Sequence, residues 1–221
     1  MTRVVENTWR ITPVAAHCLS EILGTKIFVR SDTIGKIIGG LGVWNAIGAN
    51  RVFVAAYPKH REDNFPFERG IYICFEPQCI GNFGVNFQEN DALNVRPMGS
   101  REQRAYERHG ITAQLSRGLW PDDGLQLESQ SPVSAIRIAT ADGMVEPLGK
   151  FDPGICYSYD WAVQFEFRDG TLLNLSTDLS GYGSLYGDIA VRVGPLSIRE
   201  YSHIEDVALS WREVPARENS E

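Results

Sequence analysis

Residues 155–177 read ICYSYDWAVQFEFRDGTLLNLST, and this stretch decides the fold. An apolar or aromatic residue occupies every second position of its first half, at Tyr157, Tyr159, Trp161, Val163, Phe165 and Phe167. A period of two over this length predicts a strand with one apolar face and one solvated face. Asp169 and Gly170 then predict a tight hairpin turn, because glycine readily adopts positive φ, and alternation continues in the return strand.

The rest of the chain adds helices in the first half and strands at the end. Thr12 and Pro13 predict the start of a helix that ends at Gly24, and the capping-box spacing of Ser100 and Gln103 predicts a second, short helix. Further strands are predicted at 26–30, 51–57, 70–76, 134–140, 188–194 and 206–212. Crossover helices for a parallel sheet are not predicted after residue 110. We therefore expect an α+β fold: a mostly antiparallel sheet, strand-rich in the C-terminal half, packed with one or two short helices from the N-terminal half.

Three segments carry weaker signals. Residues 31–50 combine helical spacing with five glycines, which predicts a helix over about 32–38 that breaks at Gly39 and Gly40. Residues 77–99 contain Gly, Asn and Pro too often for long regular structure. Residues 117–132 are predicted to form a mobile loop or an internal boundary.

Length and composition describe a soluble globular protein. The chain has 221 residues, 43% of them hydrophobic and 22% charged. We expect a single α+β domain over 1–214 and a disordered polar tail over 215–221. The N-terminal segment lacks the pattern of a secretory signal, and no apolar run is long enough to span a membrane, so we expect a cytoplasmic protein that does not bind membranes.

The net charge of −7 bears on partners. A negative field opposes binding to nucleic-acid phosphates and suits a basic protein partner, although solubility alone also accounts for it. The four cysteines include one close pair, Cys74 and Cys79, and zinc would require two more ligands. We therefore expect reduced thiols, no metal and no cofactor.

Two candidate binding surfaces follow from the strand-rich half. The Gly/Tyr-rich loop 181–187 presents Tyr182 and Tyr186 between Asp178 and Asp188, and tyrosine gives contact area at low entropic cost. The alternative is an ordinary connection whose tyrosines cover the sheet. The solvated face of the 157–167 strand carries Asp160 and Glu166. The alternative for that face is a surface ion pair between Glu166 and Arg168.

One group of residues suits catalysis. In an extended segment Tyr201, His203 and Glu205 point the same way, and a histidine beside a carboxylate can act as an oriented base. No nucleophile motif of the G-x-S-x-G kind accompanies them. A cluster of arginines could clamp an anion, although intervening glutamates favour a solvated face; it comprises Arg96, Arg101, Arg104 and Arg108.

Two functional hypotheses remain, with self-association through sheet edges as a third. The first is an interaction protein that binds another protein through its acidic sheet face and Gly/Tyr-rich loop. In general character only, such a small acidic protein would suit the neutralisation of a basic toxin. The alternative is an enzyme or ligand-binding protein with a pocket lined by Tyr157, Tyr159 and Trp161 and a His203–Glu205 acid–base pair.

Overall fold

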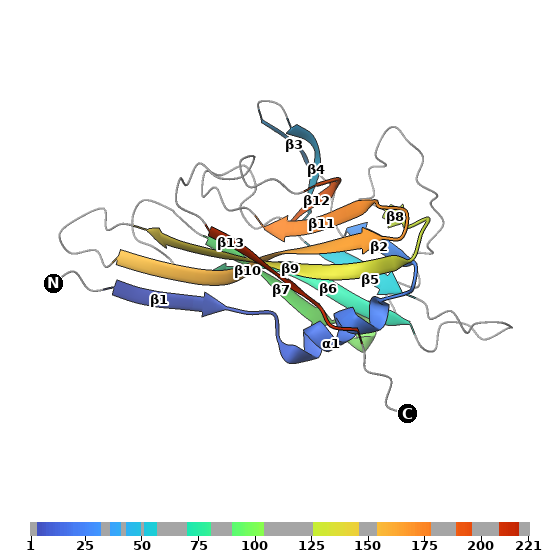
Figure 1. Cartoon of the computed structure of the whole chain (residues 1–221), viewed down its shortest axis with the longest axis horizontal. Helices are drawn as coiled ribbons and strands as arrows, with labels where there is room; N and C mark the ends of the chain where they lie inside the picture. The colour runs from blue at the N-terminus through green and yellow to red at the C-terminus, as the bar shows by residue number, and fades with distance from the viewer. Residues whose placement is uncertain are drawn as a thin grey trace, which may run out of the picture.

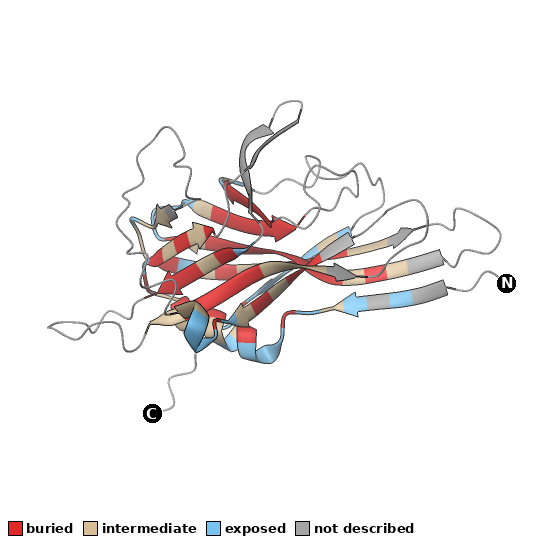
Figure 2. Ribbon diagram, turned by 180° about the vertical axis from the view of Figure 1, so that it is seen from behind, coloured by how far each residue is buried: buried red, intermediate tan, exposed pale blue. Residues whose placement is uncertain are grey.

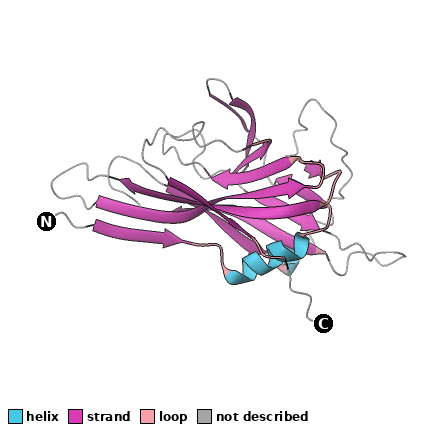
Figure 3. Ribbon diagram, in the orientation of Figure 1, coloured by secondary structure: helices cyan, strands magenta, loops and turns pink. Residues whose placement is uncertain are grey.

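Two antiparallel sheets form the body of the protein. The computed structural model describes residues 4–31, 36–40, 43–49, 51–56, 70–80, 90–103, 126–145, 154–177, 189–195 and 208–216. Strands dominate these residues, and α1 (Pro13–Ile22) lies against them, as Figures 1 and 3 show. This arrangement confirms the predicted α+β class with mostly antiparallel sheets.

The large sheet has eight strands in the order β13-β9-β10-β11-β12-β4-β3, and β1 also pairs with β10. Its strands are β1 (Val4–Trp9), β3 (Lys36–Gly40), β4 (Val43–Ala49), β9 (Val133–Val145), β10 (Gly154–Phe167), β11 (Leu172–Thr177), β12 (Ile189–Val193) and β13 (Ala208–Glu213). Among the described strands, β1 and β10 are the only pair that runs parallel. Strand β10 is long enough to pair first with β1 and then with β11 along the same edge.

The small sheet has five strands in the order β7-β6-β5-β2-β8. They are β2 (Ile27–Ser31), β5 (Val52–Ala56), β6 (Ile71–Ile80), β7 (Asn90–Pro97) and β8 (Gln126–Glu128). The main core cluster takes side chains from both sheets and from α1, including Leu19, Val54, Phe75, Phe165 and Leu175. Figure 2 shows buried residues concentrated where the sheets overlap, and exposed residues along β1 and α1.

Local sequence signals explain α1. The Thr12 hydroxyl accepts a hydrogen bond from the backbone N–H of Ala15 at 3.2 Å, and Pro13 occupies the first helical position. Gly24 follows the helix with φ of 80°. The predicted start and end of this helix are confirmed. Residues 100–103 are also helical, and the rest of the second predicted helix lies outside the described residues.

A β-bulge interrupts the pairing of β10 with β9. Asp160 lies opposite Thr140, but Ala162 lies opposite Ala139, so Trp161 is an extra residue on β10. Because successive residues of a strand point to opposite faces, one extra residue exchanges the two faces of β10 beyond the bulge.

The bulge divides the aromatic run of β10 between two clusters. Val163 and Phe165 face the main core between the sheets, whereas Tyr157 and Tyr159 belong to a separate cluster with Trp161. All five side chains are buried, as expected for a core strand. The prediction that they share one face is wrong, because period two in the sequence does not reveal the extra residue.

Three segment predictions also require correction. Residues 36–40 and 43–49 form strands β3 and β4 instead of a helix. Glycine disfavours a helix in this segment, and the backbone of β4 forms its hydrogen bonds with β12 instead. Within 77–99, where the sequence predicted little regular structure, β6 continues to Ile80 and β7 begins at Asn90. Within 117–132, predicted to be a mobile loop or boundary, Gln126–Glu128 form β8. Within the described residues, no helix is long and apolar enough to cross a membrane.

Candidate functional site

An apolar cavity lies between the edge strand β8 of the small sheet and the β10–β11 hairpin of the large sheet. Its volume is about 210 Å³. Its apolar walls are formed by Ile27, Val29, Leu127, Phe167, Leu173 and Val193. Val193 is 51% exposed, so this wall is accessible from solvent. Single exposed hydrophobic residues are common on protein surfaces, so the recess itself, and not Val193 alone, makes this a candidate site.

Hydrogen bonds stabilise the backbone on both sides of the cavity. The Ser129 N–H donates to the Ile27 carbonyl at 2.9 Å, and the Ser129 hydroxyl accepts from the Ile27 N–H at 2.8 Å. On the other side, Gly170 has φ of 82° in the hairpin turn, as predicted from the sequence. The Asp169 carboxylate there accepts a hydrogen bond from the Thr171 N–H at 3.0 Å.

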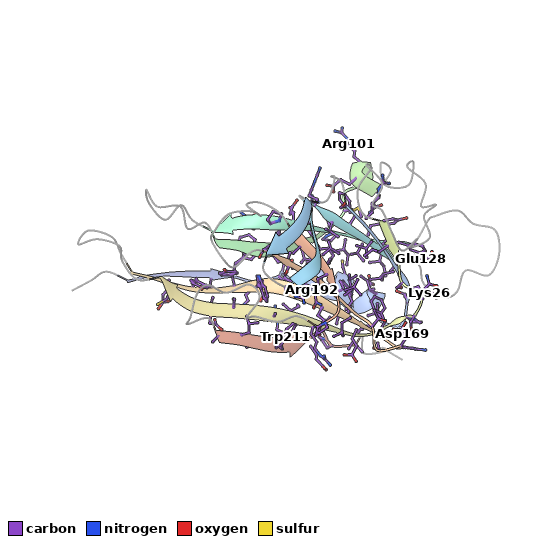
Figure 4. The ribbon with its side chains drawn as sticks, turned by 90° about the horizontal axis from the view of Figure 1, so that it is seen from above. Lys26, Arg101, Glu128, Asp169, Arg192 and Trp211 are labelled. Carbon is purple, nitrogen blue, oxygen red and sulfur yellow. The ribbon has the colours of Figure 1, made fainter. Side chains whose placement is uncertain are left out.

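Two carboxylates accompany the apolar walls. Glu128 and Asp169 both line the cavity, and Figure 4 places them at the same end of the molecule. Hydrogen bonds from Thr171 lower the pKa of the Asp169 carboxyl, which favours its charged form. The site therefore combines an apolar recess with negative charge.

Asp160, expected on a solvated face, is 0% exposed. The bulge turns it to the same side of the sheet as Val163, towards the interior. Its carboxylate accepts hydrogen bonds from the Ile11 N–H at 2.6 Å and the Thr140 hydroxyl at 2.9 Å. Arg212 of β13 completes the group with two hydrogen bonds of 2.7 and 2.6 Å to the two carboxylate oxygens.

This Asp160 cluster joins four separate parts of the chain. Its members come from the segment before α1 and from strands β9, β10 and β13. The hydrogen bonds to Asp160 raise the pKa of Arg212. Asp160 is thus buried and bonded to other parts of the same chain, so the expectation that it faces solvent is wrong and its role in the described structure is structural.

Glu166 remains accessible, with 34% of its side chain exposed. It forms an ion pair with Arg137 at 3.0 Å instead of the expected pair with Arg168. Arg137 also approaches Glu213 of β13 at 3.4 Å. The acidic face predicted from Asp160 and Glu166 therefore reduces to one carboxylate that is already paired with a cation.

Arg96 lies in a polar cluster on the small sheet. Its guanidinium donates to Glu76 at 3.0 Å and to Glu102 at 2.8 and 2.9 Å. Hydrogen bonds from Arg96 lower the pKa of Glu102 to about 2. Cys74 is nearby and fully buried, and burial raises its pKa to about 12, so it is a poor nucleophile. Arg96 is therefore neutralised within the protein and is not available as an anion clamp.

The aromatic residues expected to line a pocket lie elsewhere. Tyr157, Tyr159 and Trp161 are 3%, 1% and 0% exposed and belong to one interior cluster, and none of them lines the cavity. Burial raises the pKa of Tyr157 to about 12, and the charge of Asp142 adds to this effect. Among the described residues that line the cavity, Phe167 is the aromatic one.

Several predicted site residues lie outside the described residues. These are Asp178, Tyr182, Tyr186 and Asp188 of the Gly/Tyr-rich loop, and Tyr201, His203 and Glu205 of the catalytic hypothesis. Their roles stay predictions.

Sequence patterns did not identify the cavity or Arg212. The cavity joins residues that are far apart in the chain, and each apolar wall residue resembles an ordinary core position. The one local signal was the Asp169–Gly170 turn. Arg212 resembles any charged residue of an alternating strand, because its partner is set by strand order, which a single sequence does not reveal.

Metal-ligating side chains do not gather in the part of the chain that the structure describes: no group of three or more His, Cys, Asp or Glu residues there could hold an ion. No family model, curated protein or solved structure matches this chain.

Proposed function

We propose that this chain is a protein-binding module that accepts an apolar side chain of its partner in the cavity between β8 and the β10–β11 hairpin. The observation that carries the proposal is the apolar recess of about 210 Å³, with Glu128 and Asp169 in its lining. Small-molecule pockets usually measure about 300–1,000 Å³, so a recess of this size better suits one side chain than a whole ligand.

The negative charge of the recess and of the whole chain indicates that the partner is basic. The recess carries two carboxylates and the chain has a net charge of −7. A basic residue next to the inserted apolar side chain would meet this negative potential, which increases the association rate and favours basic partners. The free thiols of Cys18, Cys74 and Cys156 are compatible with the cytoplasmic location proposed from the sequence.

The proposal can be tested with three acetylated tripeptide amides: Lys-Leu-Lys, Lys-Ser-Lys and Glu-Leu-Glu. We expect Lys-Leu-Lys to shift the NMR methyl signals of Ile27, Leu127 and Leu173 in a saturable way. Lys-Ser-Lys should bind at least about tenfold more weakly, since burial of a leucine side chain contributes roughly 1.5–3 kcal/mol. Glu-Leu-Glu should bind roughly threefold to tenfold more weakly at low salt.

Two variants sharpen this test. Val193→Trp places a large side chain at the mouth of the cavity and should abolish the shifts. Val14→Trp is the matched control, since Val14 is 63% exposed on α1 and does not line the cavity. Shifts that persist in Val193→Trp, or that appear away from the cavity, would refute the proposal. Equal binding of free 3-methylbutylammonium would instead favour the ligand-binding hypothesis.

A further inference from the structure

Strand β13 is an edge of the large sheet with outward-facing backbone groups. Strand β13 pairs with β9, and directly after β13 the Val214 N–H donates a hydrogen bond to the Ile136 carbonyl of β9 at 2.8 Å. In an antiparallel pair, hydrogen bonding to the neighbour alternates from residue to residue. Ser210 and Arg212 therefore bond to β9, opposite Thr140 and Ile138. The N–H and C=O groups of Leu209, Trp211 and Glu213 point away from the sheet.

Trp211 lies at the middle of this edge. It is 42% exposed, one of three exposed large hydrophobic residues in the described part of the chain, together with Val14 and Val193. Figure 4, which views the molecule from above, places β13 and Trp211 along one border. An exposed tryptophan beside backbone groups that have no strand partner among the described residues is an arrangement that can recruit another strand.

The two charged residues of β13 leave the edge without net charge. Natural edge strands are commonly protected by lysine, proline or a bulge, and β13 contains none of the three in the registers observed. Its two charged residues, Arg212 and Glu213, compensate each other and pair internally with Asp160 and Arg137. The strand is therefore locally neutral, although the chain has a net charge of −7.

We propose that β13 pairs antiparallel with β13 of a second copy about a twofold axis at Trp211. Only a twofold axis at this residue uses all three outward-facing positions: Trp211 lies opposite its own copy, and Leu209 lies opposite Glu213 of the second chain. Each such pair exchanges two backbone hydrogen bonds, so the interface would contain roughly six. The two indole rings meet on one face, and the large sheet continues from one copy into the other.

The small interface predicts a weak dimer. A pairing of two six-residue edges should bury less than about 1,200 Å², the lower limit for standard stable interfaces. The dissociation constant should therefore be on the order of 0.1–1 mM, with dimer formation visible only at high concentration. This inference is independent of the proposed function, because the cavity and β13 share no residue.

Sedimentation equilibrium of the full chain tests the proposal. The weight-average mass should rise from the monomer value of 24.7 kDa towards twice that value between about 0.01 and 1 mM. Trp211→Lys should remain monomeric over this range, because it brings two cations together at the axis and protects the edge. Val14→Lys, with the same charge change at an exposed valine of α1, should behave as the wild type.

Amide hydrogen exchange locates the interface. At high concentration the amides of Leu209, Trp211 and Glu213 should gain protection, whereas Ser210 and Arg212 should be protected at every concentration. A mass that does not depend on concentration overturns the proposal, as does dimer formation by Trp211→Lys equal to that of the wild type. A dimer without the alternating protection on β13 overturns it as well.

Discussion

The alternating pattern of β10 correctly predicts a strand but wrongly predicts that Asp160 is exposed to solvent. Asp160 occupies a polar position in an alternating strand, yet it is fully buried and receives hydrogen bonds from Ile11, Thr140 and Arg212. A buried carboxylate without its counterion is costly, whereas a buried pair contributes modest net stability. The individual residue is therefore defined by its partners and not by its place in the alternation.

Arg212→Ala should lower the free energy of unfolding by about 2–4 kcal/mol, because it leaves the Asp160 carboxylate buried without a cation. Urea denaturation would measure this loss. Arg137→Ala is the control, since its ion pairs with Glu166 and Glu213 are partly exposed and should contribute less than about 1 kcal/mol. Equal losses in the two variants would contradict the assigned role of Arg212.

At the scale of the element, the bulge at Trp161 determines which side chains of β10 face the main core. The first part of the strand turns Tyr157 and Tyr159 to one face, and the later part turns Val163 and Phe165 to the other. The sequence predicted the strand, its length and its hairpin. It did not predict the bulge, because an inserted residue leaves alternation along the strand intact and is visible only in the register with β9.

Gly143 provides a test of this register. It lies opposite Tyr157, whose ring occupies the space that a Cβ at position 143 would need. Gly143→Ala should therefore lower the free energy of unfolding by about 1–3 kcal/mol. In a Tyr157→Leu background the same substitution should cost at least about 1 kcal/mol less, because the shorter side chain leaves room. Urea unfolding of the four proteins would measure this double-mutant cycle. Additive effects would mean that the side chains at positions 143 and 157 are not in contact.

At the scale of the whole molecule, the two sheets are joined by a core that draws on segments far apart in the chain. Period-two alternation was sufficient to predict β2, β5, β6, β9, β10, β11, β12 and β13, with ends within a few residues for most of them. It did not identify β1 and β8, and it was insufficient for β3, β4 and β7, whose glycine- or asparagine-rich sequences become strands because a neighbour pairs with them. The cavity depends on how the sheets are placed, so it could not be predicted from local patterns.

Acid should destabilise the whole molecule partly through Glu102. Hydrogen bonds from Arg96 lower its pKa from 4.5 to about 2, so the folded state binds this proton less readily than the unfolded state. The stabilisation is present above pH 4.5 and is lost as the pH falls towards 2. After allowance for partial exposure it amounts to about 1–2 kcal/mol.

Urea unfolding of the wild type and Glu102→Gln over pH 2–7 would measure this contribution. The difference in stability between the two proteins should be largest above pH 5 and should shrink between pH 4.5 and 2. A difference that stays constant across the range would mean that the Arg96–Glu102 pair does not act through the charge of Glu102.

The Asp160 cluster has a consequence for biosynthesis. Its members are made in the order Ile11, Thr140, Asp160 and Arg212, so the cation is the last to leave the ribosome. Domains synthesised from the N-terminus can begin to fold before they are complete. A chain released before residue 212 would have to bury a bare carboxylate or leave the sheet open, and either state invites proteolysis. Strand β13 thus distinguishes a chain that includes residue 212 from one that stops before it.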